Sequence, residues 1–98
     1  MIPYRFLSPA EEEMTEAALF YEAASNGLGS DFLNDVQKAV DRLRDYPYSG
    51  ESIDSDLRRA LLLRFPFSLI YNIDENVIVI VAVAHDSREP EYWRARAN

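Results

Sequence analysis

One stretch near the C-terminus constrains the fold more than any other. Residues 77–85 read VIVIVAVAH and contain no Asp, Glu, Lys or Arg. The many β-branched side chains favour a strand, and a strand that is apolar on both sides must be covered on both faces. The sequence therefore predicts a central strand, and the other elements must supply the layers that cover it.

Two strand-like segments precede this run, LRRALLLRF at 57–65 and FSLIYNI at 67–73. Pro66 belongs in the turn between them because proline has no N–H to donate to a ladder. The residues DEN at 74–76 form the next hairpin turn. The second half of the chain is thus predicted to be a three-strand antiparallel meander.

The first half begins with a short strand, IPYRFL at 2–7, followed by a helix from 9 to about 24. The order SPAEE predicts Ser8 as the N-cap and Glu11 at N3, each satisfying a free backbone donor. The glutamates at 11–13 are interpreted as the solvated start of this helix, where the helix dipole favours acidic side chains.

A second helix is predicted from about 28 to 46, after the breaker SNGLGSD. Its apolar residues recur at helical spacing, and Asp35 is placed on the outward face. Two helices with so short a connection make an antiparallel hairpin. The predicted fold is α+β, of order β-α-α-β-β-β, with the helix hairpin packed on an antiparallel sheet in one domain spanning 1–98.

Composition excludes several classes of protein. The chain has no cysteine and one histidine, so we expect neither a disulfide framework nor a metal site, and no cofactor. No apolar run approaches the roughly 18 residues that a membrane span needs. The N-terminal residues do not resemble a signal peptide, so a cytoplasmic location is expected.

The net charge of −7 is distributed unevenly. Residues 1–56 carry four basic and twelve acidic side chains, whereas residues 57–98 carry six arginines and five acidic side chains. An acidic chain is poorly suited to holding nucleic acid through phosphate contacts, so direct sequence-specific DNA binding is not expected. The excess of arginine lies in the C-terminal part.

The end of the central strand and the tail after it together contain the single histidine, three arginines, a tyrosine and the single tryptophan. We expect Trp93 to fold back as a lid on the core, and the arginines Arg88, Arg94 and Arg96 to be exposed. Pro90 favours a turned tail. In the first meander strand, Arg59 is expected to be the more buried and paired of two neighbouring arginines.

Three motifs in order, RR at 58–59, RFPFSLIY at 64–71 and H-x-x-R-x-P-x-Y-W at 85–93, resemble the RelE/ParE toxin superfamily. These are toxins of bacterial type II toxin–antitoxin modules, often called plasmid stabilisation proteins. The resemblance implies a cognate antitoxin that lays an extended or helical segment on the toxin. It also implies one of two activities, because ParE-like members poison DNA gyrase and RelE-like members cut mRNA on the ribosome.

Cleavage of mRNA requires a proton acceptor, a proton donor and cations for the developing charge. His85 would be the base, Arg64 and Arg88 would stabilise charge, and Tyr92 would donate a proton or stack on a base. A lone histidine at a strand end also has a purely structural interpretation. The acidic helices oppose an approach to ribosomal RNA.

Binding of gyrase needs a surface and no catalysis. Arginine, tyrosine and tryptophan are the residue types that dominate interface energetics, and the tail supplies all three. We therefore favour a ParE-like, non-enzymatic toxin, and the residues expected to bind the target or the antitoxin are Arg58, Arg64, Arg88, Tyr92, Arg94 and Arg96. A non-toxic module that only binds an antitoxin or peptide through its sheet edge remains open.

Overall fold

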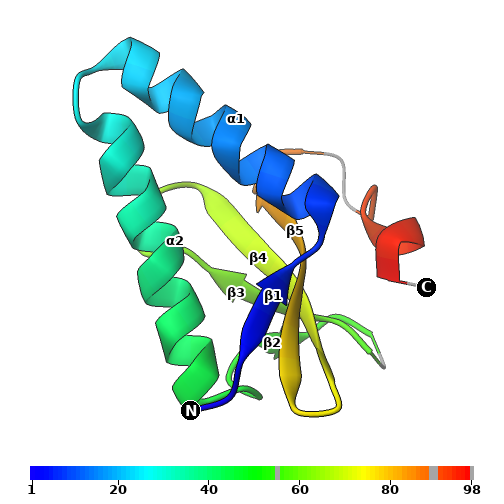
Figure 1. Ribbon diagram of the computed structural model, residues 1–98. Helices are drawn as coiled ribbons and strands as arrows, with labels where there is room; N and C mark the ends of the chain where they lie inside the picture. The colour runs from blue at the N-terminus through cyan, green and yellow to red at the C-terminus, as the bar shows by residue number, and fades with distance from the viewer. Residues whose placement is uncertain (55, 89–90, 98) are drawn as a thin grey trace.

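The structure, a computed structural model, describes residues 1–54, 56–88 and 91–97, so Pro90 lies outside the described residues. The elements follow the predicted order, with a two-residue strand and a short 3₁₀ helix in addition (Figure 1). They are β1 (Tyr4–Phe6), α1 (Ser8–Ala24), α2 (Leu28–Asp45), β2 (Glu51–Ser52), β3 (Arg58–Leu61), β4 (Phe67–Asp74), β5 (Val77–His85) and η1 (Arg94–Ala97). The α+β prediction is confirmed. No helix in the described part of the chain is long and apolar enough to cross a membrane.

Strand β5 lies inside a five-stranded sheet of order β1-β5-β4-β3-β2. It pairs antiparallel with β4 and parallel with β1, which places the first strand beside the last. Ile78 and Ile80 pack in the core on the helix side, whereas Ala82 and Ala84 pack in a second cluster on the opposite face. The prediction of a central strand covered on both faces is confirmed.

One residue of β5 interrupts the regular pairing with β4. Tyr71 pairs with Ile80 and Ile70 pairs with Ala82, so Val81 has no partner on β4. This is a β-bulge, which adds a residue to one strand and bends it. As a result Val81 and Ala82, although consecutive, both belong to the cluster on the face opposite the helices.

Helices α1 and α2 form an antiparallel pair that covers one face of the sheet (Figure 1). They approach closely at Gly29, where an added Cβ would lie 2.5 Å from the carbonyl oxygen of Ala18. The apolar positions predicted for α2 are all buried: Phe32, Val36, Ala39, Val40 and Leu43.

The predicted capping box at the start of α1 is wrong. Ser8 lies within the helix, and Leu7 is the N-cap with no side-chain hydrogen bond. The Leu7 N–H donates to the Ile80 carbonyl at 2.9 Å, so the sheet holds this residue extended until the helix begins. Backbone pairing with β5 thus determines where α1 starts.

Asp35 is also not where the helical pattern placed it, because it is buried rather than outward. Its Oδ2 accepts hydrogen bonds from the backbone N–H of Arg64 at 2.8 Å and of Phe65 at 3.2 Å. These bonds hold the connection between β3 and β4 against α2. For this reason the first meander strand ends at Leu61 rather than continuing to residue 65.

Candidate functional site

A cavity of about 440 Å³ lies on the sheet face opposite the helices, at the end of β5. Its floor is apolar and includes Ile70 and Ala84, and Trp93 is among its walls. Its polar lining comes from Arg59, Ser68, His85, Asp86, Arg88 and Tyr92. Two arginines, a histidine and two aromatic rings therefore face one space.

Three of the four residues predicted for RNA cleavage line this cavity, and the fourth does not. Arg64 lies in the β3–β4 connection, where its guanidinium is 3.6 Å from the Asp31 carboxylate of α2. Its side chain is 59% exposed, so it is the surface residue that the sequence predicted. The arginine that completes the cavity is Arg59, which the sequence pattern assigned to the core.

The pairing predicted for Arg59 is wrong, whereas both neighbouring arginines of β3 are half-buried. Arg58 is the paired one, donating to the carbonyl oxygens of Tyr48 at 3.0 Å and Gly50 at 2.8 Å. No hydrogen bond or ion pair joins the Arg59 guanidinium to another residue within 1–54, 56–88 and 91–97. The reason is that the loop before β2 returns beside Arg58, which spacing within β3 does not reveal.

His85 has its ring edge-on to Phe67, with ring centroids 5.0 Å apart. The Ser87 backbone N–H donates to its Nδ1 at 3.0 Å, and the Ser87 hydroxyl lies 2.7 Å from the same nitrogen. Because a backbone N–H can only donate, Nδ1 must be the acceptor, and a neutral ring then carries its proton on Nε2. In this arrangement neither ring nitrogen offers a free lone pair to a substrate.

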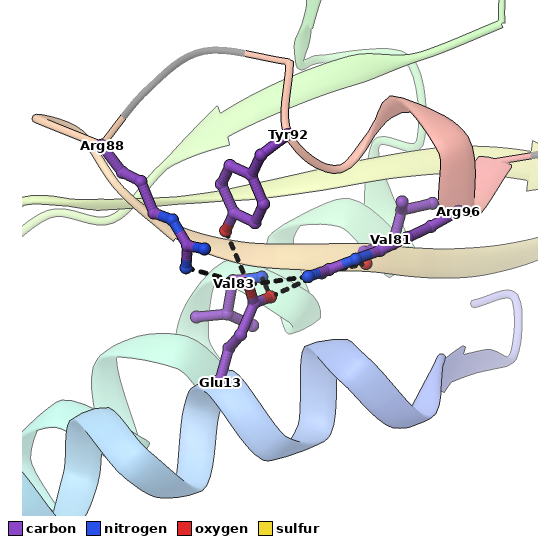
Figure 2. A network of polar contacts seen from close by, with 6 residues as sticks. All are labelled: Glu13, Val81, Val83, Arg88, Tyr92 and Arg96. Atoms are coloured by element: carbon purple, nitrogen blue, oxygen red, sulfur yellow. Dashed lines mark hydrogen bonds and ion pairs between the residues drawn. The ribbon is translucent and has the colours of Figure 1, made fainter.

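Glu13 is the centre of the polar contacts between α1 and the tail (Figure 2). Its Oε1 accepts from the Val83 N–H at 3.1 Å and from Arg96 at 2.8 Å. Its Oε2 accepts from the Tyr92 hydroxyl at 2.7 Å and from Arg96 at 3.1 Å, and lies 3.7 Å from the Arg88 guanidinium. We call this group the Glu13 network.

The interpretation of residues 11–13 as a solvated helix start is wrong for Glu13, whose side chain is only 13% exposed. The spacing of the residues around Glu13 in the sequence does indicate that it is buried. Glu13 follows Ala10 by three positions and precedes Ala17 by four, and both alanines are buried. Residues at these spacings share one helix face, so Glu13 belongs to the buried side of α1.

The Glu13 network also supplies hydrogen-bond partners to backbone groups of β5. Strand β1 pairs only as far as Ile80, so the Val83 N–H and the Val81 carbonyl lie beyond the part of β5 that β1 covers. Glu13 accepts from the first, and Arg96 donates to the second at 3.3 Å. Two oppositely charged side chains thus take the place of a neighbouring strand.

Of the three tail arginines expected to be exposed, Arg88 is exposed over 55% of its side chain and Arg94 over 42%. Arg96 is 22% exposed within the Glu13 network. Arg94 forms ion pairs with Asp54 and Glu91. The exposure predicted for Arg96 is therefore wrong, because the distant Glu13 pairs with it, whereas the exposure predicted for Arg94 is confirmed although its charge is paired. The binding role assigned to these arginines remains a prediction.

Trp93 is 3% exposed and packs in the cluster opposite the helices with Leu57, Ile70 and Val81. The predicted lid is confirmed. The tail segment that contains Trp93 also contributes Tyr92 and Arg96 to the Glu13 network. The tail is therefore held by apolar packing through Trp93 and by polar contacts through Tyr92 and Arg96.

Burial raises the pKa of the Tyr92 phenol, and its hydrogen bond to the Glu13 carboxylate raises that pKa further. An unfolded tyrosine ionises near pH 10. Above that pH the unfolded chain releases a proton that the folded chain keeps, so stability must fall as pH rises.

We therefore expect the free energy of unfolding to decrease between about pH 10 and pH 11.5. Urea denaturation at a series of pH values measures this slope. Tyr71 has a pKa raised by burial as well, so Tyr92→Phe should reduce the slope and leave the part due to Tyr71. An unchanged slope in Tyr92→Phe would contradict the contact with Glu13.

Comparisons with known proteins agree with the overall fold. Among solved structures, the isolated RelE toxin of E. coli has a TM-score of 0.68 and 17% identity, covering 97% of this chain and 95% of that one. The chromosomal ParDE toxin–antitoxin system of P. aeruginosa gives a TM-score of 0.62 and 18% identity, covering 87% and 96%. At these identities both show the fold alone. No curated protein matches the chain in sequence. The family model described as the ParE toxin of the type II toxin-antitoxin system, parDE, matches residues 4–90, and the chain therefore belongs to the ParE toxin family.

Proposed function

We propose that the chain is the toxin of a type II toxin–antitoxin pair, that it acts by binding DNA gyrase, and that a cognate antitoxin neutralises it. The proposal treats the protein as a binding protein rather than an enzyme. The proposal rests on the hydrogen bonds that His85 and Tyr92, the residues expected to act as base and acid in RNA cleavage, already make within the chain.

Those groups are engaged within the chain. Nδ1 of His85 already accepts from Ser87, so the ring has no free acceptor for the proton of a ribose hydroxyl. The Tyr92 hydroxyl donates to Glu13, and its raised pKa opposes the loss of its proton. Arg64, the second expected cation, does not line the cavity. A free base and a free acid are therefore not available beside the arginines of the cavity.

The acidic charge of the helices also favours a protein target over the ribosome. A ribosomal target would bring the acidic helices close to phosphate, which costs free energy and becomes worse at low salt. A protein target requires only a complementary surface. The exposed Arg88, stacked 3.8 Å from the Tyr92 ring centroid, is the kind of cation and aromatic pair that anchors protein interfaces.

One observation favours ribosome-dependent mRNA cleavage as a second candidate. Arg59, His85 and Arg88 face one cavity with the rings of Tyr92 and Trp93, which suits an anionic aromatic ligand such as a nucleotide. This candidate requires that His85 release Ser87 when RNA binds. A non-toxic module that binds only its antitoxin is the third outcome of the test below.

The test is a pair of assays on one preparation of folded chain, for gyrase supercoiling and for cleavage of mRNA on translating ribosomes. We expect lower supercoiling or accumulated gyrase–DNA complexes, uncut mRNA, and no effect of His85→Ala on gyrase. In the mRNA assay alone, Arg64→Ala is the control for Arg88→Ala, because Arg64 does not line the cavity. Cleaved mRNA, with a rate that falls about 10²-fold or more in His85→Ala or Arg88→Ala, would overturn the gyrase proposal. Inactivity in both assays would leave the non-toxic module.

A further inference from the structure

The second half of α1 is apolar on all sides. Residues 17–21 read AALFY. Ala17 and Ala18 are buried, whereas Leu19 is 66% exposed and Phe20 is 70% exposed. A helix that is apolar all round its axis is normally covered on every side. Here the sheet and α2 cover only the inner side of α1 (Figure 1), so the outer side has the character of a surface that a partner covers.

Two exposed glutamates share this outer side. Residues three and four apart are neighbours on a helix surface, so Glu12, Glu16, Leu19 and Phe20 form one stripe along α1. Helix α1 contains no lysine or arginine. Neither Glu12 nor Glu16 has an ion pair with another residue that the structure describes. We call these four residues the α1 outer face, and it combines large apolar side chains with uncompensated negative charge.

A cavity of about 250 Å³ adjoins the α1 outer face at the end of β5. Glu16 and Phe20 line it from the helix, and Phe67 lines it from the sheet. Arg88 also lines it, with its guanidinium 3.8 Å from the centroid of the Tyr92 ring. The α1 outer face is therefore continuous with the pair of Arg88 and Tyr92.

One backbone acceptor of this cavity is unused within the chain. Val83 lines the cavity, and its N–H points toward α1, where it donates to Glu13. The N–H and C=O of one strand residue point to the same side, so the Val83 carbonyl also points away from β4. No hydrogen bond joins this carbonyl to another residue within 1–54, 56–88 and 91–97. It can accept from a donor side chain of a partner.

The charges indicate the chemistry of the partner. A second copy of this chain is a poor fit, because two α1 outer faces would bring unpaired carboxylates of the same sign together. A complementary surface is apolar opposite Phe20 and basic opposite Glu12 and Glu16. DNA gyrase, the target proposed for this toxin, acts on DNA, and a protein that holds this dense polyanion presents lysine and arginine. Its surface chemistry therefore fits this face.

We propose that the α1 outer face, with the adjoining cavity, docks on a basic surface of DNA gyrase. Phe20 packs against apolar side chains of gyrase, and Glu12 and Glu16 pair with its lysine or arginine side chains. One of these side chains enters the cavity and donates to the Val83 carbonyl. Because Arg88 carries the opposite charge on the far side of the cavity, the charges also fix the orientation of docking. The inference rests on the proposed gyrase binding and identifies the surface that provides it.

The first test compares two exposed aromatic side chains in the binding of purified chain to immobilised gyrase. Phe20→Ala should bind about 30-fold more weakly, as expected for the loss of a central interface anchor. Tyr46→Ala is the matched control, because Tyr46 is also 70% exposed but lies at the end of α2 and does not line the cavity. Its affinity for gyrase should equal that of the unmutated chain.

The second test measures how binding to gyrase depends on salt. Salt screens exposed charges, so the unmutated chain should bind more weakly as the salt concentration rises. Glu12→Gln/Glu16→Gln should associate about 10-fold more slowly at low salt and lose most of this dependence. Asp45→Asn/Asp56→Asn removes the same charge from exposed positions outside α1 and should retain it.

The outcomes separate this inference from the proposed function. If the unmutated chain does not bind gyrase, the proposed function fails and this inference fails with it. If the unmutated chain binds, and Phe20→Ala and Glu12→Gln/Glu16→Gln bind as well as their controls, gyrase binding stands and the α1 outer face is not its site. If Phe20→Ala weakens only the complex with the antitoxin, the face belongs to the antitoxin and the inference is overturned. If Phe20→Ala does not fold, the salt dependence decides alone.

Discussion

Replacing Trp93 by alanine is expected to lower the free energy of unfolding by about 3–5 kcal/mol. The side chain is 3% exposed and covers the cluster that contains Leu57, Ile70 and Val81, so its removal leaves a cavity that these residues cannot fill. A domain of this size has a total stability of roughly 5–15 kcal/mol, so the variant should be close to unfolding at 37 °C. Urea denaturation followed by far-UV circular dichroism measures the change without relying on tryptophan fluorescence.

Tyr46→Ala is the control for Trp93→Ala. It also removes a large aromatic ring, but that ring is 70% exposed, and the expected change is within about 0.5 kcal/mol. If Trp93→Ala changed stability as little as Tyr46→Ala, the tail would not be part of the core. Trp93 would then be an anchor available to a partner.

The second large effect is expected for Glu13→Ala, which should cost about 3 kcal/mol, the lower end of the range for buried ion pairs broken by removing one partner, because Glu13 and Arg96 are still 13% and 22% exposed. The variant leaves the Arg96 guanidinium, the Tyr92 hydroxyl and the Val83 N–H without their acceptor in a region shielded from water. Chemical denaturation gives the free energy, and hydrogen exchange of the Val83 amide shows whether the β5 edge has opened.

Glu12→Ala separates the network from the charge of the helix, because Glu12 is the exposed neighbour and its removal changes net charge equally. We expect this control to alter stability by about 0.5 kcal/mol or less. The double variant Glu13→Ala/Arg96→Ala should cost less than the sum of the two single variants, because neither charge is then left unpaired. Equal effects of Glu12→Ala and Glu13→Ala would show that the network contributes nothing measurable.

The elements that the sequence predicts well are those decided by local patterns. The unbroken run 77–85 requires cover on both faces, and the structure supplies it. The apolar spacing of α2 identifies its buried residues because a helix has a fixed period. Pro66 and the turn at 74–76 fix the meander because each prevents a strand from continuing.

The errors have a common physical origin in contacts between residues far apart in the chain. Helical spacing predicts which face a residue occupies, but it does not reveal that backbone N–H groups of Arg64 and Phe65 lie beside Asp35. The same holds for the tail, where the acceptor for Arg96 comes from a helix 83 residues earlier. Asp35 and Glu13, which the sequence pattern placed on the solvent side of their helices, instead accept hydrogen bonds from elements that follow later in the sequence.

The unpaired Val81 affects more than the ladder in which it sits. A chain lacking this residue would still place Ile80 and Ala82 on opposite faces of β5, and Tyr71 and Ile70 would keep their present partners in regular register. Such a chain would lose the carbonyl that Arg96 reaches and one of the side chains packed with Trp93. Val81 therefore contributes more to the packing of the tail than to the pairing of the sheet. During divergence, this one-residue insertion and the segment that docks on it should be gained or lost together.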